Sequence, residues 1–442
     1  MHTSTLTRYL AFTLGLLVLG PTAAWSQARE VYSSPASLLI PVSEAKDGIS
    51  ADLGYRLRQG FSSRNAYYTL DENLYYNLHW EEFIPHNLIR RSGAVAELQY
   101  ALDDRVGRVR AQSTLGNLPL DELIADPRSR IQGWVVVHEG RIVYEQYPGM
   151  QEDDHHLWYS SSKSVAGLLV GLLEADGKID VNGSIDTYVP ELAVTNWKGI
   201  AIIDILDMAS GLDLHENDVT RIDPGHSVGN LFNTDLLDRT GLGTLTANEI
   251  LFGVKNKLPP GEIFEYSSLN SKMLGVLVER VSGQRVADFL SDRVWSKMGA
   301  EGDGLLGVDL WGGAAIYGMV SSRLRDKARY GMLYTPSWPV VADEQVVPPE
   351  LMDKIRDGCR PELYERAMQA RPQAERDPER RCNSRQWDAV WVDGDMFKGG
   401  ARGQGIYVSP RRDVVVAYFS TTPESGWTAY ARAIAKALAP ES

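Results

Sequence analysis

Two pairs of apolar runs, one in the first half of the chain and one near its end, have the pattern of β-hairpins. Residues 132–138 and 141–145 are rich in Val, Ile and Tyr and flank a Glu-Gly pair, while residues 405–408 and 414–419 flank a polar turn. Branched and aromatic residues on both sides of a short polar turn favour antiparallel strands. We expect these strands to pair within one sheet.

Between the two hairpins the pattern of apolar positions is helical. An apolar stretch from Val165 to Leu173 ends at an Asp-Gly pair, and Ser271 to Val281 ends shortly before Gly283. Glycine takes the left-handed conformation that ends many helices. With a last helix expected over 427–438, the chain is predicted to be α+β: an antiparallel sheet flanked by helices, with an inserted, mostly helical subdomain at about 175–300.

The N-terminus has the pattern of a secretory signal peptide. Arg8 precedes an apolar run from Leu10 to Leu19, and Ala23-Ala24-Trp25-Ser26 follows as the cleavage region. An uncleaved anchor is the alternative, but the run is shorter than the roughly 20 apolar residues that span a bilayer. We expect residues 1–26 to be removed, leaving a periplasmic or secreted protein without an integral membrane span.

The remaining chain divides into an extension and a main domain. Residues 27–117 are expected to form an N-terminal extension whose aromatic residues either cover the main domain or pack as an ordinary surface. The main domain is expected over 118–440, with a cysteine-containing insertion at about 350–390. The spacing of the two cysteines, Cys359 and Cys382, permits a disulfide in an oxidising compartment, and two free thiols are the alternative.

Composition and charge narrow the partners. The chain has 45 Lys+Arg against 58 Asp+Glu, a net charge of −13, which argues against nucleic-acid binding. With 43% hydrophobic and 23% charged residues, the composition is that of a folded globular protein. The run Asp153-Asp154-His155-His156 lacks the spacing of a zinc motif. We expect no metal and no cofactor, and a small molecule as the substrate.

Two serine motifs compete for the role of nucleophile. Gly225 to Gly229 matches the Gly-x-Ser-x-Gly elbow of α/β-hydrolases, centred on Ser227. That motif needs a buried strand before the serine and a histidine after it, but the preceding residues are polar and all eight histidines precede Ser227. The elbow is therefore disfavoured.

The second motif is Ser160-x-x-Lys163. Three residues along a helix bring both side chains to one face, so a buried, neutral Lys163 could take the Ser160 proton. Ser43 and Lys46 share this spacing by chance, but Ser160 alone opens an apolar helix, whose N-terminus favours an oxyanion. The sequence favours Ser160 over Ser227.

Three segments around these residues resemble the active-site motifs of the serine β-lactamase-related hydrolases. They are 157–164 (LWYSSSKS), 260–268 (PGEIFEYSS) and 398–404 (KGGARGQ), and the resemblance extends over about 118–438. The superfamily includes class C β-lactamases, D-alanyl-D-alanine carboxypeptidases, family VIII esterases and 6-aminohexanoate-dimer hydrolases. The resemblance implies a β-lactamase/transpeptidase-like fold and a serine hydrolase activity.

The resemblance also implies roles for individual residues. Ser160 would be the acylated nucleophile, Lys163 its proton partner, and Tyr266 a phenolate-like base or relay. We expect two lysines, Lys163 and Lys398, to pull the pKa of the tyrosine down toward neutral pH. The amides of Ser160 and Ala401 would form the oxyanion hole.

Substrate binding is expected from Ser268, Lys398, Gly399, Gly400 and Arg402. Ser268 and Gly399 stand where β-lactamases have an asparagine and a threonine, so two polar contacts to a β-lactam are missing. A strand alternation of two places Arg402 on the face of Lys398, where it either binds an anionic substrate or points outward.

These residues predict an exported serine hydrolase that cleaves a small ester or amide through an acyl-serine. One alternative is a peptidoglycan D,D-carboxypeptidase or β-lactamase. An alternative of another class is a catalytically silent binding protein that retains the pocket.

Overall fold

The computed structural model describes residues 41–62, 71–236, 245–369, 377–422 and 426–439, and the expected signal peptide lies outside this part of the chain. No helix in these ranges is long and apolar enough to cross a membrane. The strands are β1 His86–Ile89, β2 Arg110–Ser113, β3 Gly116–Pro119, β4 Ile131–His138, β5 Arg141–Gln146, β6 His156–Leu157, β7 Gly304–Gly307, β8 Val320–Ser322, β9 Arg380–Ser384, β10 Trp387–Trp391, β11 Met396–Gly400, β12 Gln404–Ser409 and β13 Val414–Ser420. The α-helices are α2 Val42–Asp47, α3 Ala51–Gln59, α5 Glu72–His79, α6 Asp104–Gly107, α7 Leu120–Ala125, α8 Lys163–Ala175, α9 Ile202–Leu206, α10 Ser227–Asp235, α11 Ala247–Phe252, α12 Ser268–Ser282, α13 Val286–Arg293, α14 Leu324–Met332, α15 Pro349–Arg356, α16 Pro361–Gln369 and α17 Thr428–Leu438.

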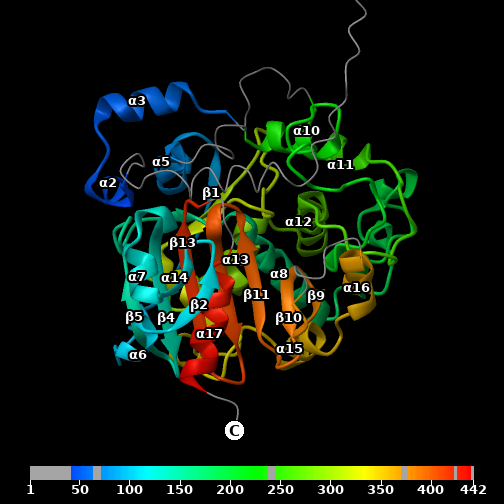
Figure 1. Ribbon diagram of the computed structural model, residues 1–442. Coiled ribbons are helices and arrows are strands. Elements are labelled where there is room, and N and C mark those ends of the chain that lie inside the picture. Colours follow the sequence, from blue (N-terminus) through cyan, green and yellow to red (C-terminus); the bar gives the residue numbers. More distant parts are fainter. Residues whose placement is uncertain (1–40, 63–70, 237–244, 370–376, 423–425, 440–442) are drawn as a thin grey trace, which may run out of the picture.

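A seven-stranded antiparallel sheet forms the centre of the molecule (Figure 1), in the order β5-β4-β13-β12-β11-β10-β9. Both expected hairpins are present, and the first turns tightly because Glu139 and Gly140 both have positive φ. Strands β4 and β13, far apart in sequence, pair antiparallel, as the sequence predicts. The predicted α+β class is confirmed.

The sheet is apolar on both faces because helices cover both. On β13, Val415 and Phe419 pack on the side of α14 and α8, whereas Val416 and Tyr418 pack with Trp427 beside α17. Successive side chains of a strand point to opposite faces. A strand buried on both faces therefore has the unbroken apolar run seen in this sequence.

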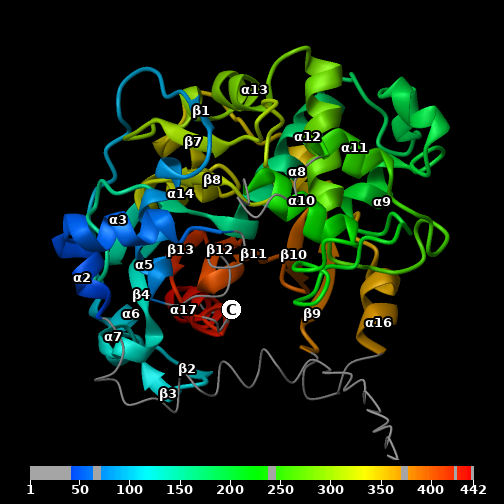
Figure 2. The same cartoon turned by 90° about the horizontal axis from the view of Figure 1, so that it is seen from above.

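Helices α8 to α12, which follow the first hairpin, lie together near one end of the sheet (Figure 2). Figure 2 shows α8 to α12 gathered on the side of β9 and β10, away from α7, β2 and β3. The longest, α12, is capped by the Ser267 hydroxyl and ends at Gly283, whose φ of 72° is left-handed, as expected. The domain boundaries drawn from the sequence stay a prediction.

The described part of the N-terminal extension packs against the main domain. Leu74, Tyr75, Tyr76 and Trp80, on and just after α5, are buried in the same apolar cluster as α8 and α12. A second sheet, β1-β7-β8-β6, joins this extension to strand β6, which lies just before the candidate nucleophile Ser160. The extension therefore helps to position that segment.

Candidate active site

The candidate nucleophile, Ser160, lies in a tight 3-10 turn, Tyr159–Ser162, directly before α8. The preceding Tyr159 has φ of 45°, a left-handed conformation that is strained for a bulky residue. Its hydroxyl lies 2.9 Å from the amide oxygens of both Asn73 and Asn77 on α5. These contacts anchor the strained residue next to the serine.

A cavity of about 510 Å³ opens beside Ser160. Its walls come from the segment 260–268 that contains Tyr266, from α16, from β9 to β11 and from the loop before α10. The lining is aromatic and charged, and includes Phe264, Tyr266, Tyr364, Phe397, Arg221 and Arg380. The cavity is large enough for a small organic substrate.

The side chain of Lys163 is fully buried on the first turn of α8. Its Nζ lies 3.0 Å from Ser160 Oγ, 3.1 Å from Ser268 Oγ and 2.8 Å from the carbonyl oxygen of Tyr317. Burial lowers the pKa of Lys163 to about 7, against the opposing effect of the Glu216 carboxylate. At neutral pH a large fraction of the amine is therefore unprotonated and able to accept the serine proton.

Tyr266 lies between two lysines, with each Nζ 5.0 Å from the centre of its ring. The pKa of this tyrosine is nevertheless raised well above 10, by burial first and then by the carboxylates of Asp388 and Glu216. The sequence-based expectation of a lowered pKa was wrong in direction, because burial of the tyrosine, together with the two carboxylates, outweighs the effect of the lysines. A protonated Tyr266 fits the relay role and not the phenolate role.

Lys398 is also fully buried, and the sequence did not reveal its partner. Its Nζ is 2.5 Å from Asp388 Oδ1 and 3.5 Å from the Tyr266 hydroxyl. Ala389 pairs with Phe397 in the β10–β11 register, which puts Asp388 across from Lys398. A cross-strand pair of this kind depends on register, which the sequence left open.

Ser268 contacts Lys163 and is itself hydrogen-bonded to a buried acid. Its backbone N–H donates to Glu216 Oε2 at 2.7 Å, while Glu216 Oε1 accepts from Arg221 Nε at 3.1 Å. Sequence reasoning missed both Glu216 and Arg221, which lie in irregular chain between Gly211 and α10. Ser268 was expected to bind substrate, and the structure places its hydroxyl on Lys163.

The chain after Lys398 runs very close to the segment that carries Ser160. Gly399 donates its N–H to Asp388 Oδ2 at 2.9 Å, and a Cβ on Gly400 would meet the carbonyl oxygen of Trp158 at 2.4 Å. Gly399, Gly400 and Ala401 line the cavity together with Ser160. The oxyanion hole formed by the amides of Ser160 and Ala401 stays a prediction.

Arg402 does not share a strand face with Lys398, so that expectation was wrong. Strand β11 ends at Gly400, and Arg402 has φ of 64° in the turn that follows. The left-handed residue breaks the alternation of two on which the expectation depended.

The competing serine has none of the elbow geometry. Ser227 is the first residue of α10, and the residues before it form turns instead of a strand. The side chains of the run from Asp153 to His156 do not gather at one site. Asp154 accepts the N–H of Gln151, while His156 is buried and stacks on Phe419.

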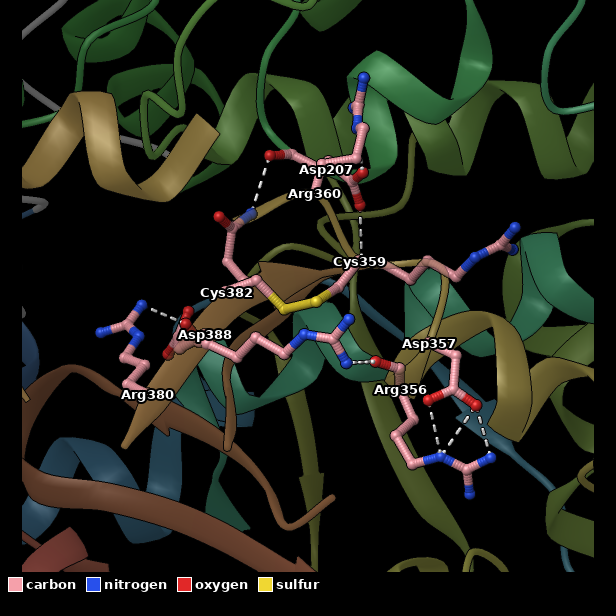
Figure 3. Close-up of a disulfide and its surroundings, with 11 residues drawn as sticks. Asp207, Arg356, Asp357, Cys359, Arg360, Arg380, Cys382 and Asp388 are labelled. Atoms are coloured by element: carbon pink, nitrogen blue, oxygen red, sulfur yellow. Dashed lines mark hydrogen bonds and ion pairs between the residues drawn. A yellow bond between two sulfur atoms is a disulfide. The ribbon is translucent and has the colours of Figure 1, made fainter. Parts of the chain in front are cut away.

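Cys359 and Cys382 form a disulfide, shown in Figure 3. It joins the α15–α16 connection to β9. Arg360 forms ion pairs with Asp204 and Asp207 at the end of α9, and Asn383 donates to the carbonyl of Asp207. The disulfide therefore joins the chain before α16 to β9, and the contacts of Arg360 and Asn383 tie this wall of the cavity to α9.

The fold and the Ser-Lys-Tyr arrangement are typical of the β-lactamase-type serine hydrolase family. A family model described as Beta-lactamase matches residues 120–441, and the chain belongs to this family. This confirms the resemblance inferred from the three motifs.

Among individual proteins, the chain is similar to 6-aminohexanoate-dimer hydrolase of Paenarthrobacter ureafaciens, with 30% identity over 66% of this chain and 72% of that protein. A solved structure of a candidate 6-aminohexanoate-dimer hydrolase from Bacillus anthracis superposes with a TM-score of 0.72 at 22% identity, covering 87% of this chain and 99% of the other. A class C β-lactamase superposes with a TM-score of 0.52 at 14% identity, covering 73% and 96%. These two structures show the shared fold.

Proposed function

We propose that the protein hydrolyses a small ester or amide through an acyl-Ser160 intermediate. The observation that carries this proposal is the 3.0 Å contact between Ser160 Oγ and a buried lysine whose pKa lies at about 7. A lysine with its usual pKa near 10.4 would be almost fully protonated at neutral pH and could not act as a base.

Acylation begins with the neutral amine of Lys163. Its two N–H groups donate to the Tyr317 carbonyl and to Ser268, which leaves the lone pair for the Ser160 hydroxyl. The amine takes the hydroxyl proton as Oγ bonds to the substrate carbonyl carbon, and the carbonyl oxygen becomes an oxyanion beside the amides of Ser160 and Ala401.

Collapse of the intermediate breaks the bond to the leaving group. The protonated Tyr266 donates its proton to the departing oxygen or nitrogen and recovers one from the Lys163 ammonium. In the second half of the reaction, a water molecule attacks the acyl carbon and its proton passes to the neutral amine of Lys163. The Lys163 ammonium then returns a proton to Ser160 Oγ as the bond between Oγ and the acyl carbon breaks and the acid product is released.

The chemistry leaves two kinds of scissile bond open. The curated relative at 30% identity is named for hydrolysis of 6-aminohexanoate dimers, which supports an amide substrate. The absence of the asparagine and threonine of β-lactamases at positions 268 and 399 supports ester or amide substrates over β-lactams.

We also propose that the protein is exported. The apolar N-terminal run supports this, as does the Cys359–Cys382 disulfide, because disulfides persist in oxidising compartments. N-terminal sequencing of protein from a native host fraction tests it, and an intact residue 1 in a cytoplasmic fraction would contradict it.

The nucleophile is tested by intact-mass analysis after exposure to a fluorophosphonate. We expect one adduct, on the peptide that carries Ser160, and none in Ser160→Ala. Ser227→Ala is the matched control and should label like the wild type. Labelling lost in Ser227→Ala and retained in Ser160→Ala would move the nucleophile to the other motif.

A further inference from the structure

An acidic side chain, that of Asp388, lines the cavity beside Ser160. Asp388 on β10 holds Lys398 on β11 through Oδ1 at 2.5 Å, and its Oδ2 accepts the Gly399 N–H at 2.9 Å. Figure 3 shows Asp388 beside Arg380, on the side of β10 near the disulfide. The positive charge of Lys398 is therefore already engaged within the protein.

The two charges of this pair are not equally accessible. The side chain of Lys398 is 0% exposed, whereas that of Asp388 is 26% exposed and lines the cavity beside Ser160. A substrate group that enters the cavity next to β10 and β11 therefore meets the Asp388 carboxylate before the Lys398 ammonium. The pair is neutral in sum but presents its negative end to the substrate.

From this arrangement we propose that Asp388 is a specificity-determining residue that selects neutral substrates over carboxylate-bearing ones at this edge of the cavity. The proposal rests on the proposed esterase or amidase function. Like charges within a few ångströms in a partly buried site repel strongly enough to change affinity by about 10- to 100-fold.

Two arginines also line the cavity, and both are engaged by the protein. Arg221 pairs with Glu216 and Asp218. Arg380 lies 4.1 Å from the centre of the Tyr364 ring and donates to the backbone carbonyl of Asp388. The proposed exclusion therefore concerns a substrate group placed against Asp388 and not the whole cavity.

The test compares matched ester pairs that differ by one carboxylate. p-Nitrophenyl hexanoate and mono-p-nitrophenyl adipate differ on the acyl side, and methyl 4-acetoxybenzoate and 4-acetoxybenzoate differ on the leaving-group side. The measured quantity is the neutral-to-anionic ratio of kcat/KM, which cancels any effect of a substitution on the shared chemistry. We expect the wild type to prefer the neutral ester and Asp388→Asn to lower the ratio at least tenfold in at least one pair.

Asp377→Asn is the matched control, because Asp377 lines the same cavity but accepts from Trp391 Nε1 at 2.7 Å and not from Lys398. It should leave both ratios within about twofold of the wild type. A measurement without any substitution adds a second arm: raising the salt concentration should lower the wild-type ratio, because salt screens charges near solvent.

The outcomes separate the inference from the function beneath it. Efficient ester hydrolysis with equal ratios in wild type and Asp388→Asn, or an equal drop in Asp377→Asn, would overturn the inference and leave the serine hydrolase intact. Absence of both ester hydrolysis and phosphonate labelling in the wild type would remove the proposed function and this inference with it.

Discussion

Substituting Glu216 by glutamine should shift the acid limb of the pH–rate profile to lower pH. Lys163 acts as a base only when neutral, so kcat/KM rises as pH increases through the Lys163 pKa, which is about 7. The Glu216 carboxylate stabilises the ammonium form and so raises that pKa. Glutamine retains an acceptor for the Ser268 N–H but removes the charge, and the pKa should fall.

The size of the shift follows from the connection between the two groups. Lys163 donates to the Ser268 hydroxyl at 3.1 Å, and the Ser268 amide donates to Glu216 at 2.7 Å. Such a chain places the charges on the order of 6 Å apart, which gives about 0.7 to 3 kcal/mol between bulk water and an effective dielectric constant of 20. The limb should therefore move down by about 0.5 to 2 pH units.

Other charged groups near Lys163 also contribute to its pKa. Lys398 and Arg221 lower its pKa and Asp388 raises it, while the rings of Tyr266 and Tyr317 pack against its Nζ. Because Glu216 also pairs with Arg221, its removal leaves that guanidinium to lower the Lys163 pKa further.

The assay is kcat/KM for a neutral p-nitrophenyl ester between pH 5 and 9, with the rate of inactivation by a neutral phosphonate as a second readout of the same limb. Glu265→Gln is the matched control, because Glu265, which precedes Tyr266 in the chain, forms its ion pair with Lys257. An acid limb that stays in place or moves upward in Glu216→Gln would refute the assignment of Lys163 as the base.

Three further substitutions test other parts of the site. Tyr266→Phe should lower kcat by at least about a hundredfold without loss of fold, the usual effect of removing a proton donor, and near wild-type turnover would make the tyrosine structural. Tyr159→Phe removes the contacts to two asparagines of α5 and should cost about 1 to 3 kcal/mol in the free energy of unfolding by denaturant; an unchanged midpoint would show that other contacts hold the segment. The double variant Cys359→Ser/Cys382→Ser should lose about 3 kcal/mol of stability, or roughly 3 to 4 °C in Tm, and an unchanged Tm in oxidised samples would contradict a stabilising role for the disulfide.

Features that follow from the pattern of apolar and polar positions were predictable from the sequence. The β4–β5 and β12–β13 hairpins follow from apolar runs around tight polar turns, and α12 follows from its periodicity and the glycine that ends it. The pairing of β4 with β13 followed from the need of two apolar strands, far apart in sequence, for neighbours on both sides. The Ser160-x-x-Lys163 contact followed because both residues lie within one helical turn.

Contacts between individual side chains far apart in the sequence were not predictable. Glu216 lies in a stretch without periodicity and reaches Ser268 from 52 positions away. Asp388 could be matched to Lys398 only with the β10–β11 register in hand. The error on Arg402 has a different origin, because a left-handed residue after a strand cannot be read from an alternation of polar and apolar positions.

The different surroundings of the two lysines explain why one can act as a base. Burial lowers the pKa of Lys398 as well, but its direct contact with the Asp388 carboxylate opposes that shift and favours the charged form. The hydrogen-bond partners of Lys163 are two hydroxyls and a carbonyl, all uncharged, and its nearby acid, Glu216, is connected to it through Ser268. A carboxylate in direct contact with Lys163 would raise its pKa and keep it protonated at neutral pH. The single intervening residue therefore allows Glu216 to moderate the cost of burial while the amine remains able to accept the Ser160 proton.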